Sequence, residues 1–161
     1  MLEQCHANLD QVSAAQILFN PERSRNLQVV SSRNIAQAFA EDLAGRLRQS
    51  DVFARLGGDE FGVLLPDSDA DFARHVGERI LKAFERPIMV QRLPIELSAS
   101  VGVAVAPDHA VEAEDLLRRA DAAVQAARGL GGGTCTVYSP KYDLHDPENV
   151  ALLGELRRID S

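Results

Sequence analysis

The strongest constraint on the fold is a hairpin in the middle of the chain. Two short runs with β-strand character, residues 52–56 and 61–65, are separated by Gly57-Gly58-Asp59-Glu60. Glycine supplies the positive φ angles that tight hairpin turns require. We therefore expect two antiparallel strands joined by this turn.

Apolar residues recur at helical spacing in three further segments. The first is carried by Ile35, Phe39, Leu43 and Leu47, and the others span about residues 68–85 and 112–128. Glycines between residues 129 and 133 predict a stop for the third helix. Weaker patterns indicate helices at residues 2–13 and 147–161.

The remaining apolar runs predict strands. They cover residues 14–19, 88–91, 95–106 and 134–138. The first run is expected to stop at Asn20-Pro21, with a polar loop over residues 22–32, because proline cannot donate a backbone hydrogen bond. Strands alternate with helices, but a hairpin interrupts the alternation. This order predicts an α/β (α+β) sandwich with a central mixed, largely antiparallel sheet flanked by helices.

Composition limits the functions that the chain can serve. Its 161 residues suit one domain with a sizeable core, and the net charge of -7 argues against a basic surface for nucleic acid or an anionic membrane. Cys5 and Cys135 lie far apart without ligand spacing, which fits a reducing compartment. The chain has no signal-peptide pattern and no apolar run of about 20 residues, so we expect a cytoplasmic location.

The run Ala54-Arg55-Leu56-Gly57-Gly58-Asp59-Glu60-Phe61-Gly62-Val63-Leu64-Leu65-Pro66 resembles the signature hairpin of GGDEF domains in the diguanylate cyclase family. Two later segments, residues 98–104 and 116–123, are similar to the strand and the last helix of that family. The resemblance covers roughly residues 2–138. It implies a nucleotidyl-cyclase-like GGDEF fold, with residues 1–140 forming a GGDEF domain truncated at its N-terminus.

The resemblance also implies a reaction. The family condenses two GTP molecules into cyclic di-GMP, each held by one subunit of a dimer, and uses a divalent metal, usually Mg²⁺. Gly57 and Gly58 would let the nucleotide approach the backbone. Asp59 would be the metal-binding carboxylate, and Glu60 the second acid that assists metal binding or catalysis.

Three subsites depart from the family pattern. Asn20 stands where a second metal-binding Asp is expected, and Asn lacks the negative charge that holds a divalent cation. Gln28 and Arg33 fall nearest the guanine-reading positions, and an Arg offers no acceptor to the base. At the phosphate end Arg128 remains, but Gly132 replaces the second cation.

A second ligand site is implied next to the hairpin. Arg48 and Asp51 form an Arg-x-x-Asp pattern at the family's offset for product inhibition, and Arg79 matches a further arginine of that site. Arginine suits guanine or phosphate through paired donors. The alternative is a helix-end salt bridge between Arg48 and Asp51 without a ligand.

These observations favour a degenerate GGDEF domain that binds cyclic di-GMP, or GTP with Mg²⁺, and regulates a neighbour. Two alternatives stay open, an active diguanylate cyclase and a ligand-free dimerisation or docking module. Residues 149–158 are similar to the helix that leads from GGDEF domains into EAL phosphodiesterase domains, so residues 141–161 are expected to be a linker and helix of that kind. A homodimer would form through the GGDEF domain or an adjoining EAL domain. No contact with nucleic acid or membrane is expected from this segment.

Overall fold

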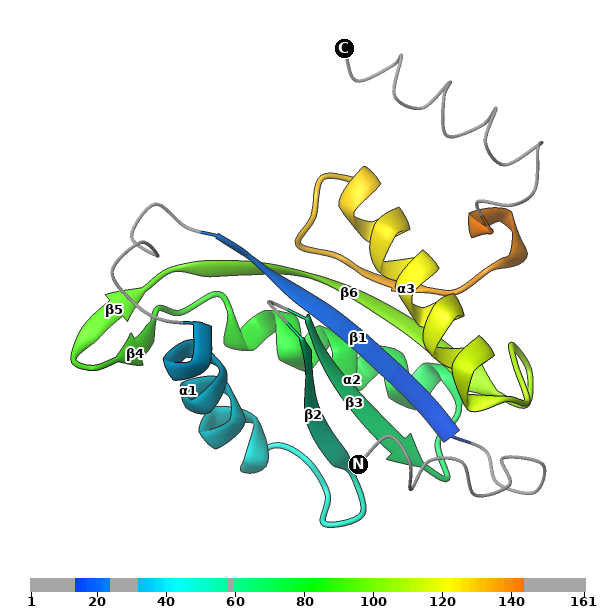
Figure 1. Ribbon diagram of the computed structural model, residues 1–161, viewed down its shortest axis with the longest axis horizontal. Helices are drawn as coiled ribbons and strands as arrows, with labels where there is room; N and C mark the ends of the chain where they lie inside the picture. Colours follow the sequence, from blue (N-terminus) through cyan, green and yellow to red (C-terminus); the bar gives the residue numbers. More distant parts are fainter. Residues whose placement is uncertain (1–13, 24–31, 58–59, 144–161) are drawn as a thin grey trace.

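The computed structural model describes residues 14–23, 32–57 and 60–143. Within them, a five-stranded sheet has the order β2-β3-β1-β6-β7, and a two-stranded sheet pairs β4 with β5. Only the β6–β7 pair is parallel. The mixed, largely antiparallel sheet flanked by helices is therefore confirmed (Figure 1).

The first strand is longer than the sequence predicts. β1 spans Ala14–Arg23 and runs through Asn20 and Pro21 instead of ending there. Its pairing with β3 reaches only as far as Phe19, while its pairing with β6 continues to Arg23. Beyond Phe19 the strand thus has one partner. A proline fits such a stretch, because its missing N–H falls where no ladder bond is needed.

The predicted hairpin is confirmed in the part that the structure describes. β2 covers Val52–Gly57 and β3 covers Glu60–Pro66, and the two strands pair antiparallel with Gly57 opposite Glu60. The register shifts between Arg55 and Gly57, next to the turn. β3 also pairs with β1, so the hairpin forms one side of the central sheet.

The segment between residues 88 and 106 holds one more strand than expected. A short hairpin of β4 (Ile88–Val90) and β5 (Leu93–Ile95) precedes the long strand β6 (Leu97–Ala106). Gln91 and Arg92, with φ angles of 50° and 67°, form its turn without a glycine. Because the usual glycine signal is missing, the pattern predicted two strands rather than three. The last strand, β7, is Cys135–Val137.

The three helices follow the predicted periodicity. They are α1 (Ser32–Ala44), α2 (Ala70–Ala83) and α3 (Ala113–Gly129). Asp69 is the N-cap residue of α2, because its side-chain carboxylate accepts a hydrogen bond from the Phe72 backbone N–H at 2.8 Å. A 3-10 turn at Pro140–Tyr142 follows β7. None of the described helices is long and apolar enough to span a membrane.

Each face of the sheet has its own core. On one face, large side chains of β3 and β6 pack against α1 and α2; this core includes Phe61, Val63, Leu65, Val76 and Ile80. On the other face, α3 packs against small residues; this core includes Ala104, Ala106, Ala120, Ala123 and Leu116. The predicted helices at residues 2–13 and 147–161 lie outside the described residues.

Candidate functional site

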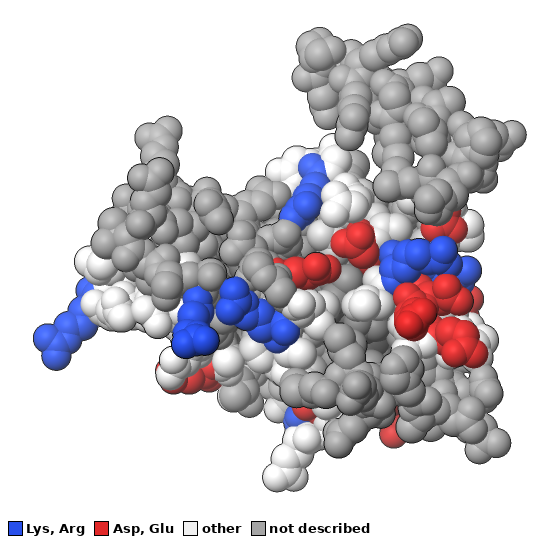
Figure 2. All heavy atoms as spheres, viewed as in Figure 1, with Lys and Arg blue, Asp and Glu red and all other residues white. Residues whose placement is uncertain are grey.

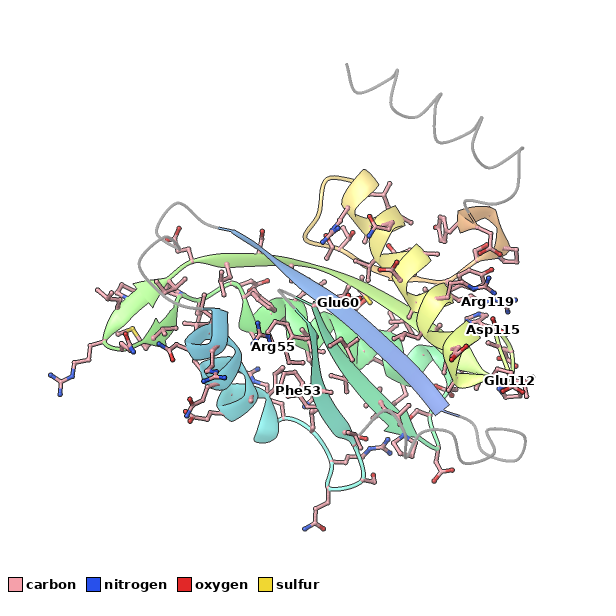
Figure 3. All side chains as sticks on the ribbon, viewed as in Figure 1. Phe53, Arg55, Glu60, Glu112, Asp115 and Arg119 are labelled. Atoms are coloured by element: carbon pink, nitrogen blue, oxygen red, sulfur yellow. The ribbon has the colours of Figure 1, made fainter. Side chains whose placement is uncertain are left out.

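The hairpin and α3 together form the described part of the predicted nucleotide site. Glu60 opens β3, and Gly57 closes β2 directly opposite it. Arg128 lies half-buried in the last turn of α3. Gly58 and Asp59 lie outside the described residues. In Figure 3, Glu60 stands at the beginning of β3, well away from Glu112, Asp115 and Arg119 near the N-terminal end of α3.

Two charged neighbours act on Glu60. Burial raises the pKa of the Glu60 carboxyl, the nearby Asp121 carboxylate raises this pKa further, and the Arg128 guanidinium lowers it. Arg128 therefore lies near enough to Glu60 to stabilise its charged form. Asp121 also belongs to this neighbourhood, although sequence patterns did not single it out. Its seven-residue spacing from Arg128 puts both on one helix face and could have identified it.

Asn20 lies in the second half of β1. It pairs with Ser100 of β6, two residues beyond the Leu18–Gly102 pair. On the other side of β1, Phe19 pairs with Phe61, the residue after Glu60. The backbone thus brings Asn20 and Glu60 to adjacent positions of neighbouring strands.

The donor set is of the kind that binds hard divalent cations. Among the described residues, no three His, Cys, Asp or Glu side chains form a group able to hold a metal ion. Glu60 nevertheless has a second carboxylate, Asp121, close enough to disfavour its charged form. Two carboxylates that repel each other in a half-buried place are relieved by a cation with oxygen preference, such as Mg²⁺. The described residues therefore bring two acids near each other but do not by themselves form a complete cation site.

The turn after α3 carries glycine where the family resemblance implies a second cation, and its backbone is left-handed. Gly132 adopts a φ of 76°, and its N–H donates to the Ala127 carbonyl at 3.2 Å. The flanking Gly131 and Gly133 have φ angles of 102° and 69°. This left-handed turn suits glycine and strains other residues. Arg33, nearest to the predicted base-reading position, is exposed in the first turn of α1, and Gln28 lies outside the described residues.

The three residues predicted for the second ligand site lie in one neighbourhood. The Arg48 Nε donates to Asp51 Oδ1 at 3.2 Å, and the Arg48 backbone N–H donates to Asp51 Oδ2 at 2.8 Å. Arg79 of α2 reaches the same turn, where its guanidinium donates to the Arg46 carbonyl at 2.8 Å. The Arg48–Asp51 salt bridge of the ligand-free alternative is thus present, and Arg79 bonds to the chain two residues before Arg48.

Arg48 is also held from other directions. Its Nη2 donates to the Pro66 carbonyl at 3.0 Å and to the Ser68 hydroxyl at 2.9 Å, and its Cζ lies 4.7 Å from the centre of the Phe72 ring. The Arg48 side chain is 45% exposed, but that of Asp51 is only 2% exposed. A ligand can therefore reach the open face of Arg48, but it reaches Asp51 only if this pair opens.

Charges of both signs alternate at the other end of α3. Figure 2 shows a basic group directly above an acidic one at the right of this face, where Figure 3 labels Glu112, Asp115 and Arg119. Asp115 is paired with Arg118 at 2.8 Å. Arg119 lies with its Cζ 5.5 Å from the centre of the Tyr138 ring. The Arg119–Tyr138 contact connects the first half of α3 to the segment after β7.

Comparison with known proteins agrees with this geometry. The model of the family "Diguanylate cyclase, GGDEF domain" matches residues 34–134. The diguanylate cyclase TpbB of Pseudomonas aeruginosa is 35% identical over 121 residues, which cover 74% of this chain and 26% of TpbB. The bifunctional diguanylate cyclase/cyclic di-GMP phosphodiesterase MucR of the same species is 30% identical over 119 residues, covering 74% of this chain and 17% of MucR.

A solved structure shares the fold. The GGDEF domain of TpbB from Pseudomonas aeruginosa superimposes with a TM-score of 0.77 at 25% identity, covering 87% of this chain and 88% of that one. This chain spans about a quarter or less of the two full-length relatives. The matched region contains the hairpin, most of α1, and the whole of α2 and α3, whereas β1 and β7 lie outside it. The chain therefore belongs to the diguanylate cyclase GGDEF family of cyclic di-GMP signalling.

Proposed function

We propose that this GGDEF domain is a degenerate one, which binds cyclic di-GMP or GTP and regulates a neighbouring domain rather than making cyclic di-GMP at a family-like rate. The observation that carries the proposal is the turn after α3. By the family resemblance, Gly132 replaces the second phosphate-binding cation, and its left-handed conformation favours glycine over arginine.

The remaining residues support binding of a nucleotide more than its turnover. Arg128 offers one cation to the triphosphate, and Glu60 with Asp59 would hold a Mg²⁺ that stabilises charge on the phosphates. With Asn20 in β1, one negative charge of the metal site is lost. Phosphoryl transfer depends on such charge stabilisation, so its rate suffers more than ground-state binding.

The residues nearest the guanine-binding position also support a degenerate domain. Arg33 is exposed on α1 and carries only donors, so it cannot accept a hydrogen bond from the guanine amine or ring N–H. A site that lacks these acceptors discriminates poorly for guanine. GTP would then be held mainly through its phosphates and the metal ion.

The Arg48 neighbourhood supports binding of cyclic di-GMP. Its guanidinium is fixed by Asp51, Pro66 and Ser68, so little side-chain freedom remains to be lost on binding. A held guanidinium with an open face can pair with a guanine edge or a phosphate. Arg79, anchored on the Arg46 carbonyl, adds a second positive charge beside it.

Calorimetry with cyclic di-GMP tests this binding. Arg48→Ala should abolish the heat, and Arg48→Lys should weaken binding about tenfold or more, because lysine keeps the charge but lacks the planar pair of donors. Arg74→Ala is the matched control, since Arg74 is an exposed arginine on α2 paired only with Asp71 among the described residues. Thermal unfolding of each variant verifies that it is folded. An absence of heat from the unmodified chain at high micromolar ligand would refute the proposal for cyclic di-GMP.

An active diguanylate cyclase is the second candidate, and the intact Gly57-Gly58-Asp59-Glu60 turn favours it. The register of β1 offers a repair test. Asn20→Asp would restore the missing charge and should raise the Mg²⁺-dependent affinity for GTP. Adding Gly132→Arg should help less than the sequence alone suggests, because the left-handed turn strains an arginine.

We further propose that the chain works within a longer signalling protein, with residues 141–161 leading into an EAL domain. The likeness of residues 149–158 to such a leader helix supports this, as does the bifunctional name of MucR. A homodimer through either domain would place two sites together. Gel filtration with light scattering, on the longer protein and on this chain, tests the dimer.

A further inference from the structure

The guanidinium of Arg48 is held on one edge and free on the other. Its Nε and Nη2 lie 3.2 and 3.1 Å from Asp51 Oδ1, and Nη2 also donates to the Pro66 carbonyl and the Ser68 hydroxyl at 3.0 and 2.9 Å. Within the part of the chain that the structure describes, Nη1 has no hydrogen-bond partner. The two N–H groups of Nη1 are therefore the donors of Arg48 that remain for a ligand.

The Ser68 hydroxyl that receives Nη2 has a fixed orientation. It donates its one hydrogen to the Pro66 carbonyl at 3.0 Å, so a lone pair of its oxygen is turned toward Arg48. Ser68 is buried, with only 3% of its surface exposed. A buried oxygen of this kind is already ordered by the fold, so it can hold an arginine without losing freedom of its own.

Ser68 stands beside the N-cap of α2 but does not cap the helix. The Asp69 carboxylate does so, by accepting the Phe72 backbone N–H at 2.8 Å, and α2 begins at Ala70. The start of α2 therefore does not depend on the Ser68 hydroxyl. The bond from Arg48 to Ser68 links the turn that carries Arg48 to the segment before the helix.

The ring of Phe72 covers one face of the same guanidinium. The Arg48 Cζ lies 4.7 Å from the ring centre, within the range of a cation–π contact. Because Asp69 binds the backbone N–H of Phe72, the cap also fixes the place from which this ring projects. The Arg48 side chain is still 45% exposed, so Ser68 and Phe72 hold it without closing it off.

We propose that Ser68 and Phe72 are positioning residues of the cyclic di-GMP site, which hold the Arg48 guanidinium so that Nη1 is presented to the ligand. The inference rests on the proposed binding of cyclic di-GMP and adds two residues from the start of α2 to Arg48, Asp51 and Arg79. The N–H groups of Nη1 suit an acceptor oxygen, which a phosphate or the guanine carbonyl supplies. An arginine that is held before the ligand arrives loses less conformational entropy on binding.

Calorimetry with cyclic di-GMP on the full chain measures the effect. Ser68→Ala should weaken binding about fivefold, as expected when one long side chain must be ordered on binding. Ser68→Thr keeps the hydroxyl and should bind like the unmodified chain. Phe72→Leu stays apolar but loses the ring, and it should weaken binding about threefold.

Tyr138→Phe is the matched control. It also removes a hydrogen bond made by the hydroxyl of a buried residue, but on the α3 side of the sheet. Its affinity for cyclic di-GMP should equal that of the unmodified chain. Thermal unfolding of every variant verifies that it is folded at the temperature of the titration.

Two further readouts separate positioning from a general loss of stability. Nuclear magnetic relaxation of the Arg48 Nε, without ligand, should show a more mobile side chain in Ser68→Ala than in the unmodified chain or in Tyr138→Phe. In an Arg48→Lys background, Ser68→Ala should cause no further loss of affinity, because lysine has no Nη2 for Ser68 to hold.

The outcomes distinguish this inference from the function on which it rests. Equal affinity of Ser68→Ala and the unmodified chain would overturn the inference, as would an unchanged mobility of Arg48 or losses from Ser68→Ala and Arg48→Lys that simply add. If Arg48→Ala then still abolishes the heat, the proposed binding of cyclic di-GMP stands and only the positioning role is refuted. An absence of heat from the unmodified chain would refute the proposed binding itself, and the inference with it.

Discussion

The two faces of the central sheet are built from different residues and serve different ends. Beneath α1 and α2, large side chains such as Phe61, Leu65 and Ile80 fill the core. Beneath α3, alanines and Gly102 let the helix lie close to the strands. The first face mainly supplies apolar burial, and the second mainly fixes where charged groups stand. A mutation on the first face should therefore change mainly the stability of the protein, and a mutation on the second face mainly the position of the site.

The largest expected effect on stability is on the α1 and α2 face. Leu65 is fully buried there, so Leu65→Ala should lower the free energy of unfolding by about 2–5 kcal/mol, through lost burial and the cavity left behind. Urea unfolding followed by circular dichroism measures this. Below the transition, the affinity for Mn²⁺, used as a probe in place of the Mg²⁺ of the proposed nucleotide site, should stay as in the unmodified chain. A large loss of Mn²⁺ affinity without a loss of stability in Leu65→Ala would contradict the proposed difference between the two faces.

On the α3 face, Gly102→Ala should show the opposite balance. The added methyl group meets backbone atoms of Ala120 and Val124 that cannot rotate away, and overpacking of this kind costs about 1–3 kcal/mol. Because the helix must shift, Mn²⁺ affinity should fall more than in Leu65→Ala. Gly129→Ala is the control, since no atom lies within 4 Å of its added Cβ. Equal metal binding in Gly102→Ala and Leu65→Ala would contradict the account.

A smaller effect is expected in the segment that follows β7. Tyr138 donates its hydroxyl hydrogen bond to Asp143 at 2.7 Å and is nearly buried. Tyr138→Phe should cost about 1 kcal/mol in unfolding free energy, the usual worth of one such bond. Amide exchange at residues 139–143 should quicken, while exchange in α1 and α2 should not. Uniform quickening across the protein would indicate that this contact stabilises the whole fold.

The smallest effect concerns pH. Burial lowers the pKa of His109, Asp108 partly opposes this, and Arg119 adds to the lowering. Its Nδ1 also accepts a hydrogen bond from the Val105 N–H at 2.9 Å, which needs the unprotonated nitrogen. Since the folded pKa lies below the unfolded value of about 6.5, the unfolded state takes up the proton first. The contribution to stability is full above about pH 6.5 and is lost as the pH falls toward the folded pKa.

Urea unfolding between about pH 7.5 and 5, an interval that spans the ordinary His pKa, checks this sign. The unmodified chain should lose stability more steeply than His109→Gln as the pH falls. A steeper slope in the variant would mean that His109 is stabilised in its charged form. The histidine stands at the α3 end away from Glu60, so metal binding should be the same in both proteins.

Much of the fold could be predicted because local patterns and tertiary contacts agree. Leu43 and Ile80 keep helical spacing and are buried, and the strands on either side of the Gly-Gly sequence pair antiparallel as expected. The extension of β1 through Pro21 depends on which neighbour each residue has, and this is not a local property. The β4–β5 turn uses Gln91 and Arg92 with positive φ, for which residue type gives little signal.

The candidate site could also be predicted from the sequence only in part. The hairpin, Arg128 and the Arg48–Asp51 pair could be found from motif and spacing. Asp121 could not be chosen from sequence with the same certainty, because an exposed acid in a helix is ordinary. Its place depends on the rotation of α3, which is set by Arg119 against Tyr138 and by Gly102 beneath the helix. Those contacts join parts of the chain far apart in sequence.

The most direct test of the central claim is a GTP turnover assay with Mg²⁺, in which cyclic di-GMP is separated by chromatography. The whole diguanylate cyclase TpbB, measured alongside, is the positive control. We predict that this chain forms cyclic di-GMP far more slowly than TpbB, while calorimetry still detects cyclic di-GMP binding that Arg48→Ala abolishes. Cyclic di-GMP formed at a rate like that of TpbB would contradict a degenerate domain and establish an active cyclase.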